Sequence, residues 1–161
     1  MAVDMFLKLG KMEGEAGGEG HKGEIDVLAW SWGLSNSGNA HMGGGVGAGK
    51  VNVQDLSFTK YIDKSSPDLM LACCNGAHIP EAKLTVQKSA GDKPLDYLKI
   101  TLQEIMVTSV STGGSGGEDR LTENVTLNFS KVKVEYTEQT ETGTSKAKPA
   151  MGWDVRANKK L

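Results

Sequence analysis

The residues that most resemble a chemical motif lie in a glycine-rich segment, Gly43 to Lys50. Gly44, Gly49 and Lys50 have the G-x-x-x-x-G-K spacing of a phosphate-binding loop. Val51, however, occupies the position where that motif needs Ser or Thr to hold a magnesium ion. The residues that follow alternate as in a strand, whereas a phosphate-binding loop opens a helix whose N-terminal amides face the phosphate. The segment therefore predicts a glycine loop that leads into a strand, and nucleotide or small-ligand binding remains an alternative.

The histidines and cysteines form no recognisable metal-binding pattern. His21, His41 and His78 share no strand or helix spacing with one another or with the cysteines. Cys73 and Cys74 are adjacent, so they lack the two-residue spacer of metal and redox motifs. We expect the histidines on the surface or in loops, each cysteine to be a small buried hydrophobic residue, and no metal or cofactor.

A hydrolase is a second alternative, based on the segment STGGSGGED from Ser111 to Asp119. This segment has neither a G-x-S-x-G elbow nor a histidine nearby in the sequence. Glu118 and Asp119 precede Arg120, a pattern typical of a solvated turn before a strand. We therefore expect no enzyme activity.

The length and charge of the chain limit its domain count and its partners. The 161 residues suffice for one domain, residues 1–161, with a substantial core. The 18 basic and 20 acidic residues give a net charge of −2, which does not favour nucleic acid or an anionic membrane. No apolar run approaches the roughly 20 residues of a membrane span, and the N-terminus lacks the apolar core of a signal peptide. We expect synthesis and folding in the cytoplasm, with free thiols.

Apolar residues alternate with a period of two along most of the chain, which indicates antiparallel strands. The alternating sets are Val3, Met5, Leu7 and Leu9; Leu28, Trp30, Trp32 and Leu34; Leu84 and Val86; and Leu98, Ile100 and Leu102. The alternation changes phase between Leu102 and Ile105, and again between Phe129 and Val132, without a turn signal. Such slips are typical of bulges or bends that carry one strand into another sheet. The expected fold is mainly β: a two-sheet antiparallel barrel with extended glycine-rich loops.

One short helix is predicted over residues 66–75. Ser66 is a candidate N-cap, Pro67 suits the first helical position, and Asn75 with Gly76 offers a stop. The apolar face would consist of Leu69, Met70, Cys73 and Cys74. A helix this short is unstable alone, so it must pack against the barrel.

The strand that contains Trp30 and Trp32 has a second face of small residues. If the tryptophans enter the core, Ile25, Val27, Ala29 and Ser31 lie on the opposite side. That face is smooth and too apolar for open solvent. It indicates either a surface that lines a channel or meets another subunit, or ordinary burial beneath a loop.

Three long segments resemble the Hcp family, the tube protein of bacterial type VI secretion. They are DVLAWSWG at 26–33, VNVQDLSFTKYIDKSSPDLM at 51–70 and STGGSGGEDRLTENVTLNF at 111–129. The resemblance extends over almost the whole chain, from AVDMFLK to GWDVR. It implies a two-sheet barrel with one flanking helix, six copies that close into a ring, and rings that stack into a tube.

The resemblance also implies partners and residue roles. The partners would be other copies of the chain, the spike protein at the tube tip, the contractile sheath and small effector toxins held in the ring, and the protein would be secreted. We expect Ala29 and Ser31 to face the lumen. The loop expected to reach a neighbouring subunit or ring consists of Gly43, Gly44, Gly45, Val46, Gly47, Ala48, Gly49 and Lys50, and the ring-stacking loop contains Ser115, Glu118 and Asp119.

Overall fold

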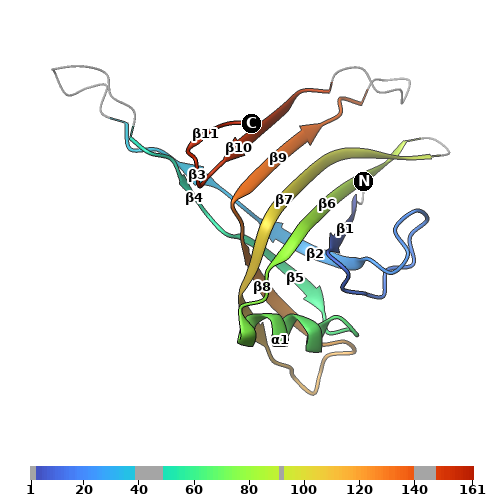
Figure 1. The fold of residues 1–161 in the computed structure, drawn as a ribbon. Coiled ribbons are helices and arrows are strands. Elements are labelled where there is room, and N and C mark those ends of the chain that lie inside the picture. Colours follow the sequence, from blue (N-terminus) through green and yellow to red (C-terminus); the bar gives the residue numbers. More distant parts are fainter. Residues whose placement is uncertain (1–2, 39–48, 91–92, 140–147) are drawn as a thin grey trace, which may run out of the picture.

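The chain folds as a β-barrel with one flanking helix and a projecting strand pair (Figure 1). The computed structural model describes residues 3–38, 49–90, 93–139 and 148–161. The elements are β1 (Val3–Leu9), β2 (Ile25–Ser31), β3 (Leu34–Ser35), β4 (Asn52–Val53), β5 (Leu56–Tyr61), α1 (Ser66–Asn75), β6 (Ile79–Ala90), β7 (Lys93–Thr112), β8 (Thr122–Asn128), β9 (Lys131–Tyr136), β10 (Ala150–Asp154) and β11 (Lys159–Lys160). Over the described ranges no helix has the length and apolar character needed to cross a membrane.

Six antiparallel strands close the barrel in the order β7, β6, β1, β2, β5 and β8, because β8 also pairs with β7. The first sheet contains β1, β6, the first half of β7, β9, β10 and β11. The second sheet contains β2, β5, β8 and the second half of β7. The predicted two-sheet barrel is confirmed.

β7 passes from one sheet to the other near Glu104. Gln103 pairs with Lys131 of β9, whereas Met106 pairs with Asn128 of β8. Glu104 has a φ of 55°, a left-handed conformation that turns the strand, and its carboxylate accepts a hydrogen bond from the Ser130 hydroxyl. The phase change predicted between Leu102 and Ile105 is therefore a bend at a sheet corner.

The second predicted phase change separates β8 from β9. β8 pairs with β5 and with the second half of β7, whereas β9 pairs with the first half of β7 and with β10. Phe129 and Val132, on either side of the break, are both buried in the core. The chain leaves the second sheet for the first at Ser130 without a long loop.

The apolar side chains of both sheets meet inside the barrel and beneath α1. The fully buried large ones include Leu7, Leu9, Ile25, Leu56, Phe58, Leu69, Leu84, Leu102, Ile105 and Leu127. Alternation along each strand puts these residues on the inner face, so burial of apolar area supplies most of the stabilising free energy.

The predicted face assignment of β2 is partly wrong. Ile25 and Val27 are 0% and 5% exposed and belong to the core, whereas Ala29 and Ser31 are exposed. The pairing with β5 shifts register between Val27 and Ala29. A bulge adds one residue, so side chains on either side of it exchange faces. The sequence shows no polar break at Leu28 that would have revealed this bulge.

The helix bounds were predicted correctly, but its cap and its buried face were not. Ser65, not Ser66, is the N-cap residue, and Gly76 ends the helix with a left-handed φ of 63°. Ser66, Leu69 and Ala72 face the core. Cys74 is exposed and Met70 is partly so, because the buried stripe follows a spacing of three residues; Cys73 is half-buried.

Candidate functional site

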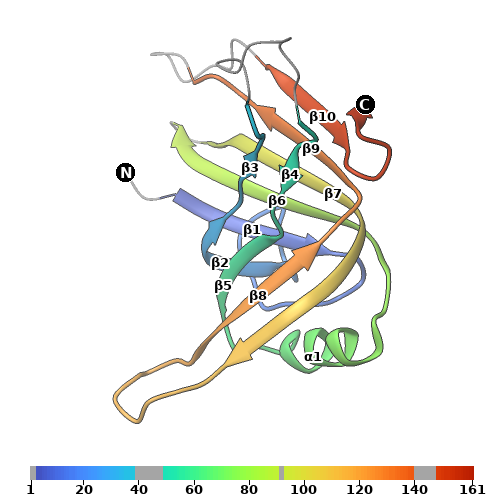
Figure 2. The same cartoon turned by 90° about the vertical axis from the view of Figure 1, so that its left-hand side faces the viewer.

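Two parallel rows of small side chains cross the outer surface of the second sheet. Direct cross-strand neighbours share a face of a sheet, so the pairing registers identify the rows. One row is Ser31, Ser57, Thr126 and Ser109, and the other is Ala29, Thr59, Asn124 and Ser111. We call these eight residues the polar face. Its four strands lie side by side in Figure 2.

Hydrogen bonds join many of these side chains to one another. The Thr59 hydroxyl donates to Asn124 Oδ1 at 2.6 Å, and the hydroxyls of Ser109 and Thr126 are 2.7 Å apart. At the edge of the face, Thr108 lies within 2.6 Å of the Thr126 hydroxyl and donates to Asp55. The eight residues carry no charged group, so the face is hydrophilic without strong electrostatic attraction.

Ala29 and Ser31 are exposed and lie opposite the half-buried Trp30, and their position in a lumen stays a prediction. The sequence analysis missed the other six residues of the polar face. A signal for them was present, because Ser57 and Thr59 alternate with the core residues Leu56 and Phe58. The polar positions of β8 alternate with Val125 and Leu127 in the same way.

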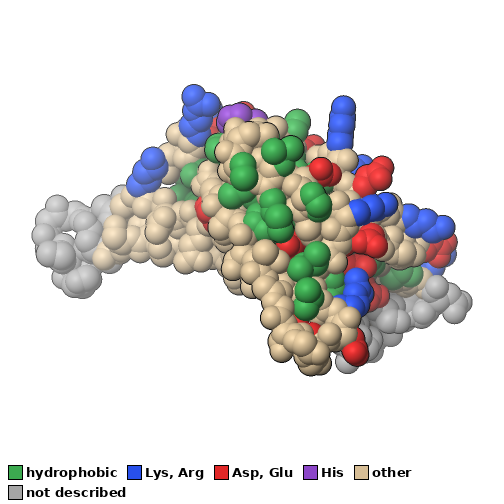
Figure 3. Space-filling view, turned by 90° about the horizontal axis from the view of Figure 1, so that it is seen from below, with side chains coloured by type: hydrophobic (Ala, Val, Ile, Leu, Met, Phe, Trp, Pro, Cys, Tyr) green, Lys and Arg blue, Asp and Glu red, His purple; other side chains and the backbone are tan. Residues whose placement is uncertain are grey.

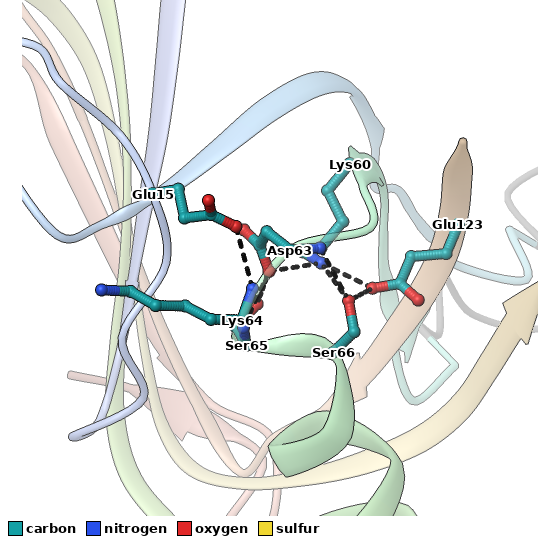
Figure 4. Close-up of polar contacts among 7 residues, drawn as sticks. All are labelled: Glu15, Lys60, Asp63, Lys64, Ser65, Ser66 and Glu123. Atoms are coloured by element: carbon teal, nitrogen blue, oxygen red, sulfur yellow. Dashed lines mark hydrogen bonds and ion pairs between the residues drawn. The ribbon is translucent and has the colours of Figure 1, made fainter. Parts of the chain in front are cut away.

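A buried charged cluster lies on the inner side of the same two strands (Figure 4). Lys60 of β5 and Glu123 of β8 are cross-strand neighbours with side chains 0% exposed, and Lys60 Nζ lies 2.5 Å from Glu123 Oε1. Ser66, in the first turn of α1, donates to the same Glu123 oxygen at 2.5 Å and accepts from Lys60 at 3.1 Å. The cluster thus ties α1 to both strands.

Asp63 completes the cluster from the loop before the helix. Its Oδ1 lies 3.0 Å from Lys60 Nζ and accepts from the Ser65 backbone amide at 2.8 Å. Next to it, Glu15 accepts from the Lys64 amide at 3.0 Å, which joins the segment after β1 to the helix entry (Figure 4). These contacts position structural elements. Those made by Glu15 and Glu123 join segments far apart in the chain, so the sequence gives no local signal for them.

The glycine loop is described only at its end. Gly43 to Ala48 lie outside the described residues, whereas Gly49 accepts a hydrogen bond from Asn36 through its carbonyl at 2.8 Å. After Lys50 the chain continues as β4, so the predicted strand is confirmed and the helix of a phosphate-binding loop does not follow. β3 and β4 form a ribbon that extends away from the barrel (Figure 1).

The proposed stacking residues lie in the connection from β7 to β8, which projects beyond the barrel (Figure 2). Ser115, Glu118 and Asp119 are exposed, and the Glu118 amide donates to the Ser115 carbonyl at 3.1 Å in a turn. Arg120 lies 3.8 Å from the centre of the Tyr61 ring, a cation–π contact that anchors the end of this connection.

One carboxylate near this anchor has a shifted pKa. Partial burial raises the pKa of Asp26, an exposed residue of β2, above its usual 3.8, and the negative charges of Asp4 and Asp63 add to the rise. The Arg120 guanidinium opposes them. Asp26 is therefore an ionisable group whose charge destabilises the folded chain.

The two histidines within the described ranges, His21 and His78, are not grouped. His21 stacks on Phe6 with ring centres 4.5 Å apart, while its Nδ1 lies 2.9 Å from Glu24. His78 is exposed near α1, and His41 lies outside the described residues. Among the residues that the structure describes, no cluster of His, Cys, Asp and Glu has the arrangement of a metal site.

Comparisons with known proteins agree on one family. The model of the family "Type VI secretion system effector, Hcp" matches residues 6–136. The protein hcp1 of Pseudomonas aeruginosa is 63% identical over 159 residues, which cover 98% of each chain. The crystal structure of Hcp1 from Salmonella typhimurium matches with 41% identity, a TM-score of 0.83 and full coverage of both chains. A solved type six secretion system protein, 32% identical, gives a TM-score of 0.93 over 99% of this chain and all of its own. On this sequence and fold similarity, the chain belongs to the Hcp family of type VI secretion proteins.

Proposed function

We propose that this protein assembles as closed rings of six copies that stack into the hollow inner tube of a type VI secretion apparatus. In this proposal residues 1–161 form a single domain, and the polar face lines the channel and holds small effector proteins. Hcp proteins are structural secretion proteins and not a known enzyme family, which agrees with a role in assembly and transport.

The polar face is the observation that supports the proposal most strongly. Two pairs of its side chains, Thr59 with Asn124 and Ser109 with Thr126, already hydrogen-bond to each other, so a passing protein gains little net energy by bonding to them. The absence of charge among its eight residues avoids tight electrostatic capture. Such a surface suits reversible retention and release of folded cargo.

The projecting elements supply contacts between copies in this proposal. The β3–β4 ribbon and the Gly43 to Lys50 loop that it carries would reach a neighbouring subunit. Ser115, Glu118 and Asp119 would meet the next ring, with weak contacts because these side chains are polar and solvated. A contact between unlike surfaces of identical copies closes into a ring only when the rotation permits it. The spike protein and the sheath would be the further partners, and export would proceed through the type VI apparatus.

A substitution on the polar face tests the cargo role. Replacing Ser31 with Gln should place a long amide over the neighbouring row and reduce retention of a co-expressed effector from the same secretion system by about tenfold. Ring assembly, measured by light scattering, should not change, because Ser31 is exposed and outside the core.

Thr101→Gln is the matched control, since Thr101 faces outward from the first sheet and gains the same side chain. Loss of rings in Ser31→Gln, or cargo retained as tightly as by the parent protein, would contradict the assignment of the polar face to the channel.

A further inference from the structure

The outer surface of the first sheet carries a row of lysines. Lys8 of β1 lies directly opposite Lys83 of β6 in the pairing register. The same row continues through Thr101 of β7 to Lys133 of β9. We call Lys8, Lys83 and Lys133 the lysine row. Like charges directly opposite on neighbouring strands destabilise a sheet, so this arrangement costs folding stability.

Within the described ranges, no acidic side chain forms an ion pair with the closest pair of the row, Lys8 and Lys83. Lys133 lies 3.2 Å from Glu135, but Lys8 and Lys83 form no ion pair with any residue that the structure describes. Both side chains are exposed. A charge arrangement that weakens the free protein, with both ammonium groups open to solvent, favours an anionic partner.

Lys8 and Lys83 border a groove of about 670 Å³ between α1 and strands β1 and β6. Its apolar lining includes Met12, Leu71, Ala72, Ala77, Ile79 and Pro80. Leu71 is 61% exposed, although it lies in a packed helix. Figure 3, which views the α1 end of the molecule, shows hydrophobic side chains gathered there with charged ones around them.

The charges around the groove are not symmetric. Three lysines lie on the side of the groove formed by β1 and β6: Lys8, Lys11 and Lys83. The acidic residues are Asp68, which belongs to α1, and Glu81, which lies two residues before Lys83 on β6. A segment bound here would place acidic residues over β1 and β6 and apolar residues against Leu71. The rim acids disfavour a uniformly anionic surface such as a membrane or a nucleic acid.

We infer that this groove and the lysine row form a docking surface for an acidic, amphipathic segment of another protein. The surface lies on the sheet that does not carry the polar face, so it is independent of cargo binding. Apolar anchors of the partner would cover Leu71, and its carboxylates would neutralise Lys8 and Lys83 and remove the repulsion between them.

Binding of a designed probe tests this inference. The probe is a fluorescein-labelled amphipathic peptide with Leu at i, i+3, i+4 and i+7 and Glu between, and its counterpart has Lys in place of Glu. Fluorescence anisotropy with the full-length protein should show binding of the acidic peptide at least about tenfold tighter than the basic one. Leu71→Ser and Lys8→Gln/Lys83→Gln should each weaken acidic-peptide binding by about tenfold.

A second variant separates docking from stability. Lys83→Glu should raise the denaturation midpoint, because the introduced carboxylate would pair with Lys8, yet it should abolish preference for the acidic peptide. Lys93→Glu makes the same charge change on an exposed residue outside the groove and should leave peptide binding unchanged.

Three outcomes would overturn the inference. The first is equal binding of the two peptides, and the second is binding of the acidic peptide with no dependence on Leu71 and the two lysines. The third is binding of phosphatidylserine vesicles or duplex DNA with dependence on the lysines alone, which would identify a general anion surface.

Discussion

At the scale of single residues, the buried ion pair between Lys60 and Glu123 decides how the barrel and the helix fit together. Both side chains occupy inward positions of strands that otherwise contribute only apolar residues to the core. Glu123 Oε1 receives both the Lys60 ammonium and the Ser66 hydroxyl, while Glu123 Oε2 is buried without a partner in the described structure. Desolvating these charges is costly, so their mutual contact is required once they are buried.

Removing one member of this pair should destabilise the protein strongly. We expect Glu123→Leu to lower the free energy of unfolding by about 3 kcal/mol, because it leaves the Lys60 ammonium buried with Asp63 as its only carboxylate among the described residues. The double variant Lys60→Met/Glu123→Leu should recover most of that loss. Urea unfolding of the three proteins measures both effects, and a loss below about 1 kcal/mol in the single variant would show that the pair is dispensable.

Asp26 should make stability depend on pH in the opposite sense to most carboxylates. Its folded pKa lies above the unfolded 3.8, so the folded state holds more protons in the window just above that pH. The contribution of Asp26 to stability therefore falls as pH rises through this window, and the penalty persists at neutral pH. Asp26→Asn should be more stable than the parent at pH 7, and this difference should disappear below pH 3.8. A variant of equal or lower stability at pH 7 would contradict the assigned cause.

At the scale of elements, most strands and the helix follow from the sequence, and the irregular positions do not. The period-two alternation predicts the strands, and the phase changes near Glu104 and Ser130 predict the two sheet corners. The bulge in β2 could not be predicted because Leu28, the residue beside it, is as apolar as its neighbours. Its exposure depends on the pairing with β5, which the local sequence does not encode.

Helix α1 likewise has features that the sequence predicts and others that it does not. Pro67 and Gly76 define its ends through backbone chemistry that is readable in sequence. Ser66 looks like a cap because Ser is common at that position, but its hydroxyl is bound to Lys60 and Glu123. Tertiary contacts therefore give Ser66 a role other than capping, while the bounds of α1 stay as the sequence predicts.

The C-terminal stop of α1 offers a test at this scale. Gly76→Ala should lower the free energy of unfolding by about 1 kcal/mol, since an added Cβ disfavours the φ of 63° that ends the helix. Steric contact adds little, because the nearest atom, Met106 Cε, would lie 3.6 Å away. Gly116→Ala, where no atom lies within 4 Å, is the control. Equal thermal midpoints for both variants would exclude a role for the left-handed cap.

At the scale of the whole molecule, the two sheets present different surfaces to their surroundings. The second sheet shows uncharged small side chains, and the first shows the lysine row beside an apolar groove. The sequence placed Ala29 and Ser31 together on the face opposite the tryptophans, but it did not reveal the rest of the polar face, because cross-strand neighbours come from four separate segments. The Hcp family assignment and the fold agree, and the proposed ring gives each surface a separate task.

Electron cryomicroscopy of the purified full-length protein, with its mass measured by light scattering, tests the central claim most directly. The proposal predicts closed rings with about six times the 17.1 kDa mass of one chain, in which Ser31, Ser57 and Asn124 line the channel. A monomer, an open assembly, or a ring with Lys8 and Lys83 facing the channel would contradict it.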